Sequence, residues 1–465
     1  MKVMMAKHED LEPSPDPELA RRFGLSTATA LIVGEVIGVG IFLTPARMAK
    51  QLGSPLLLAL VWIVMGASSI GGALCFGALA SRYPRAGGGY VYLKHAYGPR
   101  MAFLYGWLAL LVTDPGVTAA MASGLADYVG YFAPLSPWGK RGTAAMAIIA
   151  VALVNLAGAA LSSGVLRALA ALKLGSLGFL VAWGFTMGSG QWSNLALSTE
   201  RGPGADPLIP ALAGALIAAF ISYGGWWDAG KLAGETKDPG RTIPRALLLG
   251  VSIVTVVYLA LSAVFLYLVP PGRITSDQGF AALAGEALLG RAGGDTFAAI
   301  VIVALLGSLA AVFMAFPRVY YAMAKDGLFF TSMAMVNPRT GVPARAVTLQ
   351  ATLAVALVLS GSFDQILNYF MAPTLVFLAL TAGAVFVLRK ESPGIPPLGI
   401  PGYPITPLVF LIPTILLVVA LVVGDPWRSL VGLLVVAAGV PVSAWVVLRR
   451  AAAEARDASI APPSP

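Results

Sequence analysis

Two apolar segments of the chain are interrupted by glycines near their middles, and both interruptions expose main-chain groups that can bind charges. The first reads GEVIGVGI over Gly34–Ile41, and the second reads FISYGGW over Phe220–Trp226. Backbone N–H groups at the start of a half-helix suit an anion such as a carboxylate, whereas freed carbonyl oxygens suit a cation such as an ammonium group. Within a bilayer these groups must be satisfied by protein, water or a ligand, so the two breaks predict a binding site.

Among the charged residues within apolar segments, Lys173, Glu35 and Asp114 could take part in the chemistry of the site. A buried ammonium needs a partner, and ionisable residues within a membrane mark ion or substrate paths. Three roles stay open for either carboxylate: pairing with Lys173, carrying a proton, or favouring a cationic substrate. Asp228, just after the second break, is expected to face a solvated vestibule.

The composition predicts a membrane protein. With 58% hydrophobic and 11% charged residues, the 465-residue chain is too apolar for a soluble globular protein. Apolar runs of about 20 residues are long enough to cross a bilayer as helices. We expect an all-α integral membrane protein with about twelve spans, at 25–50, 56–81, 101–132, 143–162, 164–188, 208–232, 244–269, 295–324, 345–361, 364–388, 404–424 and 427–449. The runs 101–132 and 295–324 are overlong, which predicts tilt or extension beyond the membrane.

The basic residues predict the orientation. Most of the 31 lysines and arginines, with Lys231 and Arg318 among them as loop charges, fall on one side of the membrane if the N-terminus is cytoplasmic. Cytoplasmic segments attract these residues, so both termini are predicted to be cytoplasmic. The net charge of +9 therefore reflects topology and attraction to anionic lipid, and it requires no nucleic-acid partner. The polar ends 1–20 and 451–465 are expected to be mobile tails.

The spans divide into two halves that each open with a broken helix. We expect one membrane domain over 21–450, with a first repeat at about 25–188, a second at about 208–388 and two extra helices over 404–449. The sequence shows no Cys/His metal spacing, no P-loop and no polar catalytic cluster, so neither a cofactor nor enzymatic activity is expected. It also shows no filter or ring of like charges that would indicate a channel.

Four motifs in a fixed order carry a resemblance to a known family. They are GEVIGVGIFLTP over Gly34–Pro45, PRAGGGYVYL over Pro84–Leu93, FISYGGWWD over Phe220–Asp228, and GETKDP over Gly234–Pro239. Over about residues 20–450 the chain resembles the amino acid–polyamine–organocation superfamily, and within it bacterial relatives of the L-type amino acid transporters. The resemblance implies a five-plus-five inverted repeat with broken helices 1 and 6 and two extra helices.

The resemblance also implies where a substrate binds, which is between helices 1 and 6 with helices 3, 8 and 10 around it. An amino acid would place its carboxylate on the amides of the first break and its ammonium on freed carbonyls. The family usually has Gly-Ser-Gly where this chain has Val39 between two glycines, so a hydroxyl is lost and the amide donors remain. The expected substrate-binding residues are Ile37, Gly38, Val39, Gly40, Ile41, Phe220, Ile221, Ser222, Tyr223, Gly224 and Ser308.

Lys173, Tyr223 and Trp226 take further roles by the same resemblance. Lys173 falls where sodium-coupled relatives bind a cation, which argues against sodium coupling and leaves exchange and proton coupling open. Tyr223 is expected to gate the substrate together with Trp226; the alternative is that both are ordinary packing aromatics.

The expected function is sodium-independent secondary transport of amino acids, with exchange of neutral ones by alternating access. The alternatives are a proton-coupled symporter, or a transporter of cationic amino acids or polyamines. Apolar neighbours of the breaks (Ile41, Ile221 and Phe313) favour a neutral side chain. We expect a multi-pass protein of the inner cell membrane, either a monomer or a homodimer. The resemblance implies that a linked subunit would attach through a cysteine in the outer loop between helices 3 and 4. That loop, around 133–142, contains no cysteine, so no disulfide-linked subunit is expected.

Overall fold

The computed structural model describes residues 19–187, 190–196, 201–202, 205–269, 291–361, 363–389 and 398–460. This part of the chain is helical, and its only β-type pairing is an isolated bridge between Phe23 and Thr236. Of the two expected tails, residues 1–18 and 461–465 lie outside the described residues.

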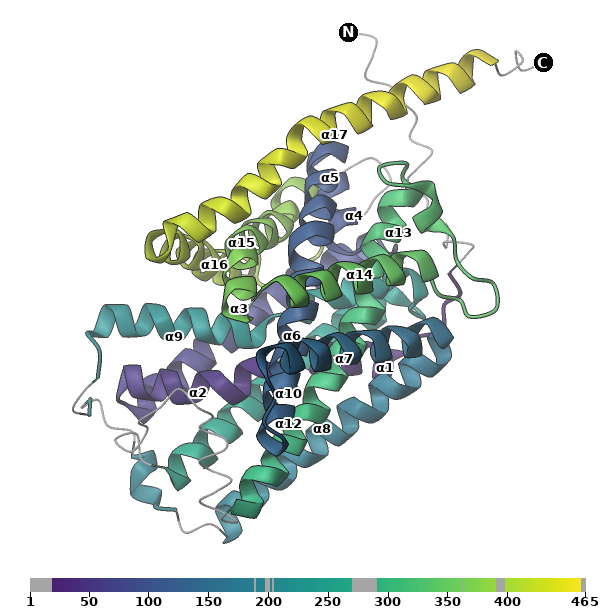
Figure 1. Cartoon of the computed structure of the whole chain (residues 1–465). Helices are drawn as coiled ribbons and strands as arrows, with labels where there is room; N and C mark the ends of the chain where they lie inside the picture. The colour runs from purple at the N-terminus through teal and green to yellow at the C-terminus, as the bar shows by residue number, and fades with distance from the viewer. Residues whose placement is uncertain are drawn as a thin grey trace.

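Figure 1 shows the helices and their labels. Their bounds are α1 (Leu25–Val36), α2 (Val39–Leu52), α3 (Pro55–Arg82), α4 (Gly89–Tyr97), α5 (Pro99–Leu108), the π-helical η2 (Ala109–Thr113), α6 (Asp114–Phe132), α7 (Pro137–Ala157), α8 (Ala159–Met187), η3 (Trp192–Leu195), α9 (Leu208–Tyr223), the 3₁₀ stretch η4 (Trp226–Glu235), α10 (Pro239–Leu268), α12 (Arg291–Ala315), α13 (Pro317–Lys325), η6 (Thr331–Ala334), α14 (Ala344–Ser360), α15 (Phe363–Leu388), α16 (Ile405–Gly424) and α17 (Pro426–Ile460).

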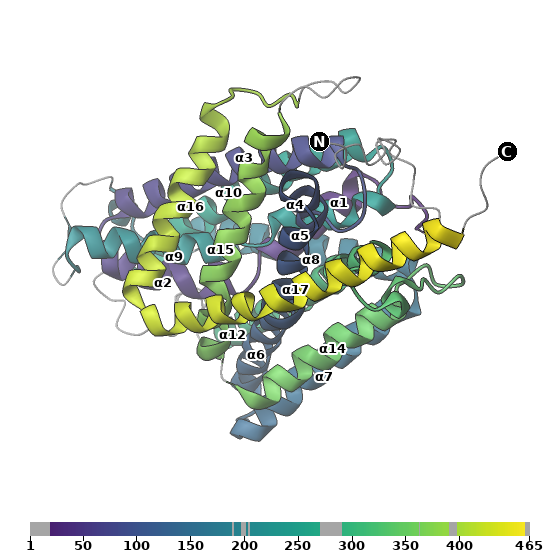
Figure 2. The ribbon, with the colours of Figure 1, turned by 90° about the horizontal axis from the view of Figure 1, so that it is seen from above.

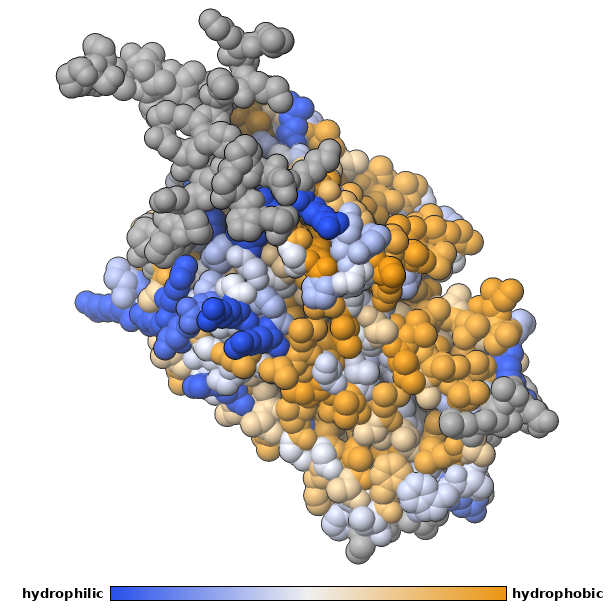
Figure 3. Space-filling model, turned by 180° about the vertical axis from the view of Figure 1, so that it is seen from behind, coloured by the Kyte–Doolittle hydropathy of each residue, from blue (hydrophilic) through white to orange (hydrophobic). Residues whose placement is uncertain are grey.

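The described residues form a multi-pass membrane protein. Ten helices are long and apolar enough to cross a bilayer, and α1 and α14 are shorter apolar helices. Large apolar side chains stay exposed on the outer helices, for example Met146 of α7, Leu416 of α16 and Leu448 of α17, each more than 60% exposed. On the face in Figure 3 hydrophobic side chains cover a broad area, while hydrophilic ones gather at one end. An apolar surface of this kind fits lipid rather than water.

The broken helices lie at the centre of the bundle. Helix α1 packs against α8, α10 and α12, and α2 packs against α9. The last two helices lie at the periphery, where α16 contacts α3 and α15, and α17 contacts α5 and α15. Figure 1 shows α17 along one edge of the molecule, and Figure 2 shows α14 beside α7. The two helix breaks predicted from the glycines therefore lie side by side in the interior.

Two expected boundaries differ from the structure. The turn expected between spans 143–162 and 164–188 lies earlier, at Gly158, whose φ of 148° ends α7 and whose place no L-residue takes easily. Ser162 and Ser163 do not interrupt α8, because their hydroxyls donate back to Gly158 O (2.9 Å) and Ala160 O (3.0 Å).

A proline marks the start of α10. The expected span starts at 244, but α10 begins at Pro239, and Pro244 lies inside the helix. Proline fits the first turn of a helix because the N–H it lacks has no partner there. At the other end of the chain α17 runs to Ile460, so residues 451–460 of the expected tail are helical.

Candidate functional site

The first helix break is held open by side chains from other helices. Helix α1 ends at Val36 and α2 starts at Val39, so Ile37 and Gly38 form the break. Gly38 N donates to Val36 O at 2.8 Å. The carbonyl of Val36 also accepts the hydroxyl of Tyr258 at 2.8 Å. The same hydroxyl lies 2.6 Å from Ser222 O, so one tyrosine joins the two breaks.

Lys173 of α8 binds the first break directly. Its side chain is fully buried, and Nζ donates to Gly34 O (2.8 Å), Ile37 O (2.6 Å) and Ser308 Oγ (3.1 Å). Ser308 itself donates to Gly34 O at 2.7 Å. The lysine therefore contacts the unwound backbone, and its ammonium makes no ion pair with a carboxylate of the described residues. Pairing with Lys173, one of the three roles left open for Glu35 and Asp114, is therefore not seen in the structure.

The second break separates α9 from η4 at Gly224 and Gly225. Gly225 has a φ of 113°, which a side chain would strain. A Cβ built on Gly225 would also lie 2.6 Å from Cγ of Glu35. The glycine thus allows the start of η4 to lie directly against the end of α1.

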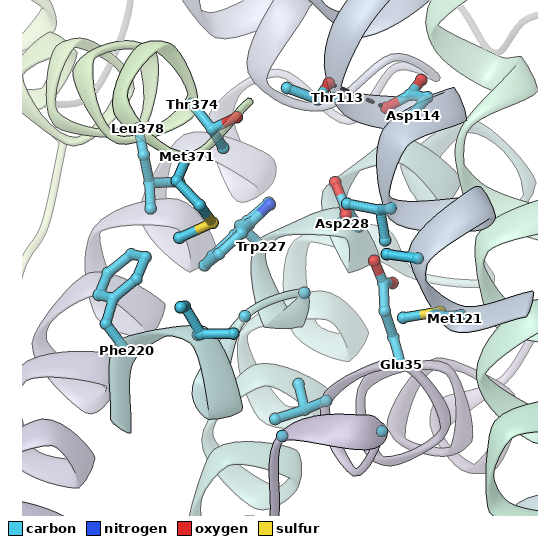
Figure 4. Close-up of a pocket in the computed structure, with 18 of the residues that line it drawn as sticks. Glu35, Thr113, Asp114, Met121, Phe220, Trp227, Asp228, Met371, Thr374 and Leu378 are labelled. Atoms are coloured by element: carbon cyan, nitrogen blue, oxygen red, sulfur yellow. Dashed lines mark hydrogen bonds between the residues drawn. The ribbon is translucent and has the colours of Figure 1, made fainter. Parts of the chain in front are cut away.

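Both breaks open onto one cavity of about 700 Å³. Figure 4 shows acidic side chains on one side of it and the apolar Phe220, Met371 and Leu378 on the other. Arg47, near the far end of α2, lines the cavity and is exposed, so the cavity reaches the surface there. Lining residues include Glu35, Gly38, Gly40, Thr44, Gln51, Asp114, Met121, Phe220, Ile221, Gly224, Trp227, Asp228, Lys231, Phe316, Met371, Thr374 and Leu378.

The structure brings only some of the expected binding residues onto the cavity wall. Gly38, Gly40, Phe220, Ile221 and Gly224 line it. Buried behind the wall are Ile37, Ile41, Ser222, Tyr223, Trp226, Ser308 and Phe313, while the side chain of Val39 lies outside the described part.

The two residues expected to gate the site point elsewhere. The hydroxyl of Tyr223 lies 3.0 Å from Thr255 Oγ1, and Trp226 packs edge-on against Phe76 and Phe410. Trp227 is the neighbouring aromatic on the cavity wall (Figure 4). Gating by Tyr223 and Trp226 stays a prediction, and both are packing residues in this conformation.

A buried charge cluster occupies one end of the cavity, which the sequence did not predict. Lys231 Nζ lies 2.8 Å from Asp228 Oδ1 and 3.5 Å from Asp114 Oδ1, with every side chain at most 5% exposed. Tyr320 donates to Asp114 Oδ2 at 2.9 Å. Lys231 is therefore no loop charge, because η4 carries it into the interior, and Asp228 lines the central cavity and not a vestibule on the N-terminal side. The sequence did contain a signal for this ion pair, since Asp228 and Lys231 are three residues apart directly after the second break.

Asp114 is placed by an irregular turn of its helix. It begins α6 immediately after the π-helical Ala109–Thr113. Single π-turns inside helices are frequent at functional sites, because they turn a side chain out of the regular helical order. Here the turn brings a carboxylate to the cavity, whereas the other carboxylate of α6, Asp127, is exposed and pairs with Lys140.

A second buried ion pair, between α13 and η4, lies on the N-terminal side of α1. Arg318 Nε lies 2.7 Å from Glu235 Oε1, and the two side chains are 1% and 3% exposed. Backbone N–H groups of Arg22 and Phe23 donate to Glu235 O, and Lys237 N donates to Phe23 O. Arg318 was expected as a loop charge, but it is buried because α13 packs against η4. The cavity is thus closed on this side and open at the α2 end.

Gly38 and Gly40 differ in how closely other atoms surround them, and this difference gives a test of the packing at the first break. A Cβ on Gly40 would lie 2.7 Å from Cα of Ser222, whereas one on Gly38 would meet its nearest atom at 3.5 Å. We expect Gly40→Ala to lower the free energy of unfolding by about 1–3 kcal/mol through overpacking. Gly38→Ala is expected to keep the wild-type melting temperature in detergent. Equal melting temperatures for the two variants would contradict the packing of α2 on α9.

Comparison with known proteins decides the family. Residues 23–440 match the amino acid permease family. The chain belongs to this family. Its members are transporters, so this permease is a transporter and not an enzyme.

Several curated proteins resemble the permease over most of its length. It is 28% identical over 435 residues to the serine/threonine exchanger SteT of Bacillus subtilis, covering 92% of this chain and 97% of that protein. It is 28% identical over 432 residues to human large neutral amino acids transporter small subunit 2, covering 91% and 80%. It is 25% identical over 432 residues to the human cystine/glutamate transporter, covering 91% and 85%.

Proposed function

We propose that the permease is a sodium-independent secondary transporter that exchanges neutral amino acids across the cell membrane by alternating access. The observation that carries this proposal is the single cavity onto which both helix breaks open. An amino acid needs partners for a carboxylate and an ammonium group at one place inside the bilayer, and two adjoining breaks can supply them. The names of the relatives, a serine/threonine exchanger and a large neutral amino acids transporter among them, agree with this substrate class.

The walls of the cavity suit an amino acid with an apolar or small side chain. The carboxylate is placed at the N-terminal turn of α2, where Gly38 and Gly40 line the cavity without side chains. Phe220, Trp227 and Leu378 form the apolar surface on which the substrate side chain would pack.

Lys173 supports independence from sodium. Its ammonium already lies against two carbonyl oxygens of the first break, at 2.6 and 2.8 Å. A fixed cation at this place repels a second one and satisfies the oxygens that would bind it. We therefore assign the driving force to exchange, with proton coupling as the alternative.

The proposal also covers the side of the membrane to which the cavity opens and the subunit composition of the permease. With both termini in the cytoplasm, the open α2 end faces the exterior and the closed side faces the cytoplasm. The only cysteine, Cys75, is buried, so we propose a monomer or homodimer without a disulfide-linked subunit. A non-reducing gel of the native membrane that shows a thiol-sensitive heterodimer would contradict this.

Transport into liposomes tests the proposed function. Purified permease would be reconstituted, and uptake of a panel of labelled amino acids measured with and without unlabelled amino acid inside, with sodium or choline outside. We expect uptake of neutral amino acids into preloaded vesicles only, at equal rates in sodium and choline. Uptake that requires sodium would overturn the coupling, and no uptake of any amino acid by correctly inserted protein would overturn the substrate class.

A further inference from the structure

We propose that Glu35, supported by Asp228, binds an ammonium group of the substrate at the closed end of the cavity. This inference rests on the proposed function and names the side chain that would recognise the cationic end of the substrate. It departs from binding by main-chain carbonyls alone, which the helix breaks by themselves suggest.

The first observation is a buried carboxylate oxygen without a partner. Glu35 is 2% exposed and lines the cavity, and its Oε2 has no hydrogen-bond partner among the described residues. Figure 4 shows its carboxyl group directed toward Asp228. A buried carboxylate is costly unless it is hydrogen-bonded and its charge is neutralised. The oxygen therefore calls for a donor that enters through the cavity.

The second observation is that carbonyls of the breaks are already engaged by the protein. Lys173 donates to Gly34 O and Ile37 O, and the single hydroxyl proton of Tyr258 lies between Ser222 O and Val36 O, the latter also accepting from Gly38 N. Ser308 adds a second donor to Gly34 O. These acceptors, which would otherwise suit an ammonium group, are occupied on the side of α8, α10 and α12. Glu35 lies between them in sequence and faces the cavity.

The third observation identifies the chemistry of the missing partner. The same cluster already binds one primary ammonium, since Lys231 Nζ lies against Asp228 and Asp114 and 4.1 Å from the ring centre of Phe316. Glu35, Asp228 and Asp114 supply three carboxyl groups, and Lys231 is the cation that lies against Asp228 and Asp114. One ammonium balances the charge of one carboxylate, so a further cation that enters beside Glu35 would find a carboxyl group with which it can pair.

Two substrate groups share this chemistry. One is the α-ammonium that every amino acid carries, and the other is the side-chain ammonium of a basic amino acid or a diamine. The α-ammonium would place any amino acid with its cationic end on Glu35 and its carboxylate toward α2. The side-chain ammonium would restrict the pocket to basic substrates.

The test compares ligand binding by the full-length permease and its Glu35→Gln and Glu35→Asp variants in detergent. The ligands are a neutral amino acid, lysine, the amine that corresponds to the neutral amino acid without its carboxylate, and its keto acid without an amino group. Asp127→Asn serves as control, because Asp127 is exposed and pairs with Lys140 outside the cavity. Gel filtration and the melting temperature without ligand report whether each variant is folded.

We expect Glu35→Gln to weaken binding of every ammonium-bearing ligand that uses the site by about 10- to 100-fold, with little change for the keto acid. Glu35→Asp should recover part of the loss. A loss for both amino acids would assign the α-ammonium, and a loss for lysine alone the side-chain ammonium.

Equal binding by Glu35→Gln and the wild type would overturn the proposal. Unchanged binding with loss of proton-driven uptake into empty liposomes would overturn it in favour of a proton site. In both cases wild-type exchange of amino acids would continue, so the proposed function would stand. Failure of the proposed function would give a different result, because the wild type would then transport no amino acid at all.

Discussion

Replacement of Lys173 by methionine is expected to reduce amino acid exchange by about 30-fold or more. The methionine has a similar length but donates no hydrogen bond, so the oxygen of Ile37 loses its donor at 2.6 Å, and the oxygen of Gly34 loses the ammonium at 2.8 Å and keeps only the hydroxyl of Ser308. Each unpaired buried carbonyl costs about 1–3 kcal/mol, and every 1.4 kcal/mol is a factor of ten. The break would relax toward continuous helix, and the amides that face the substrate would be lost from the cavity.

Exchange into preloaded liposomes measures this effect, alongside a matched surface variant. Lys140→Met removes an exposed ammonium that pairs with Asp127 at 2.6 Å. Surface ion pairs contribute about 0–1 kcal/mol, so the control should lie within about threefold of wild type. Wild-type exchange rates for Lys173→Met would show that the lysine only fills space between α8 and α1. Activity restored by sodium in that variant would point to a cation site emptied by the substitution.

The sequence predicted the helix breaks well because glycine and hydropathy act locally. A run such as GVG within an apolar segment leaves backbone unpaired wherever the segment lies, and the structure has its breaks at Ile37–Gly38 and Gly224–Gly225. The burial of Lys173 could also be predicted from its position in the sequence, since a lysine far inside an apolar run must find a partner. The identity of its partners could not be predicted from that position, and the structure shows them to be the carbonyl oxygens of Gly34 and Ile37 at the first break.

The acidic end of the cavity could not be predicted in the same way. Lys231 and Asp228 follow the second break in a stretch whose polar residues read as a loop, and a 3₁₀ helix carries them inward instead. The contact between Asp114 and Lys231 depends on the π-helical turn before Asp114, and the hydropathy of the sequence does not predict that turn. The apolar wall at Met371 and Leu378 likewise depends on how α15 packs, since many positions of an apolar helix look alike in sequence.

The two kinds of buried charge in this permease have different consequences for transport. Lys173 binds neutral carbonyl oxygens at the first break, and we expect it to hold that break open when substrate is bound. Arg318 and Glu235 join α13 to η4, outside the cavity and on the N-terminal side of α1. A transporter that works by alternating access must separate such a contact whenever this side opens. The ion pair therefore selects a conformation and does not bind substrate.

Breaking this pair is expected to open the closed side of the cavity. Glu235→Gln leaves the Arg318 guanidinium buried without its counter-charge, which costs about 3–5 kcal/mol in the conformation described here. The cost disappears when η4 moves away and water reaches the arginine. The population should therefore shift by a factor of about 100 or more toward the conformation with the N-terminal side open.

A single reporter cysteine measures this shift. Cys75 is replaced by serine, and Ala120, which lines the cavity, is replaced by cysteine. A membrane-impermeant maleimide applied to either side of the liposome should label the parent from the α2 side and the Glu235→Gln variant from the N-terminal side. The double variant Glu235→Gln, Arg318→Met removes the unpaired charge and should return toward the parent pattern. Identical labelling of the parent and Glu235→Gln would show that the ion pair does not control access, and closure would then rest on the backbone contacts between Phe23 and Lys237.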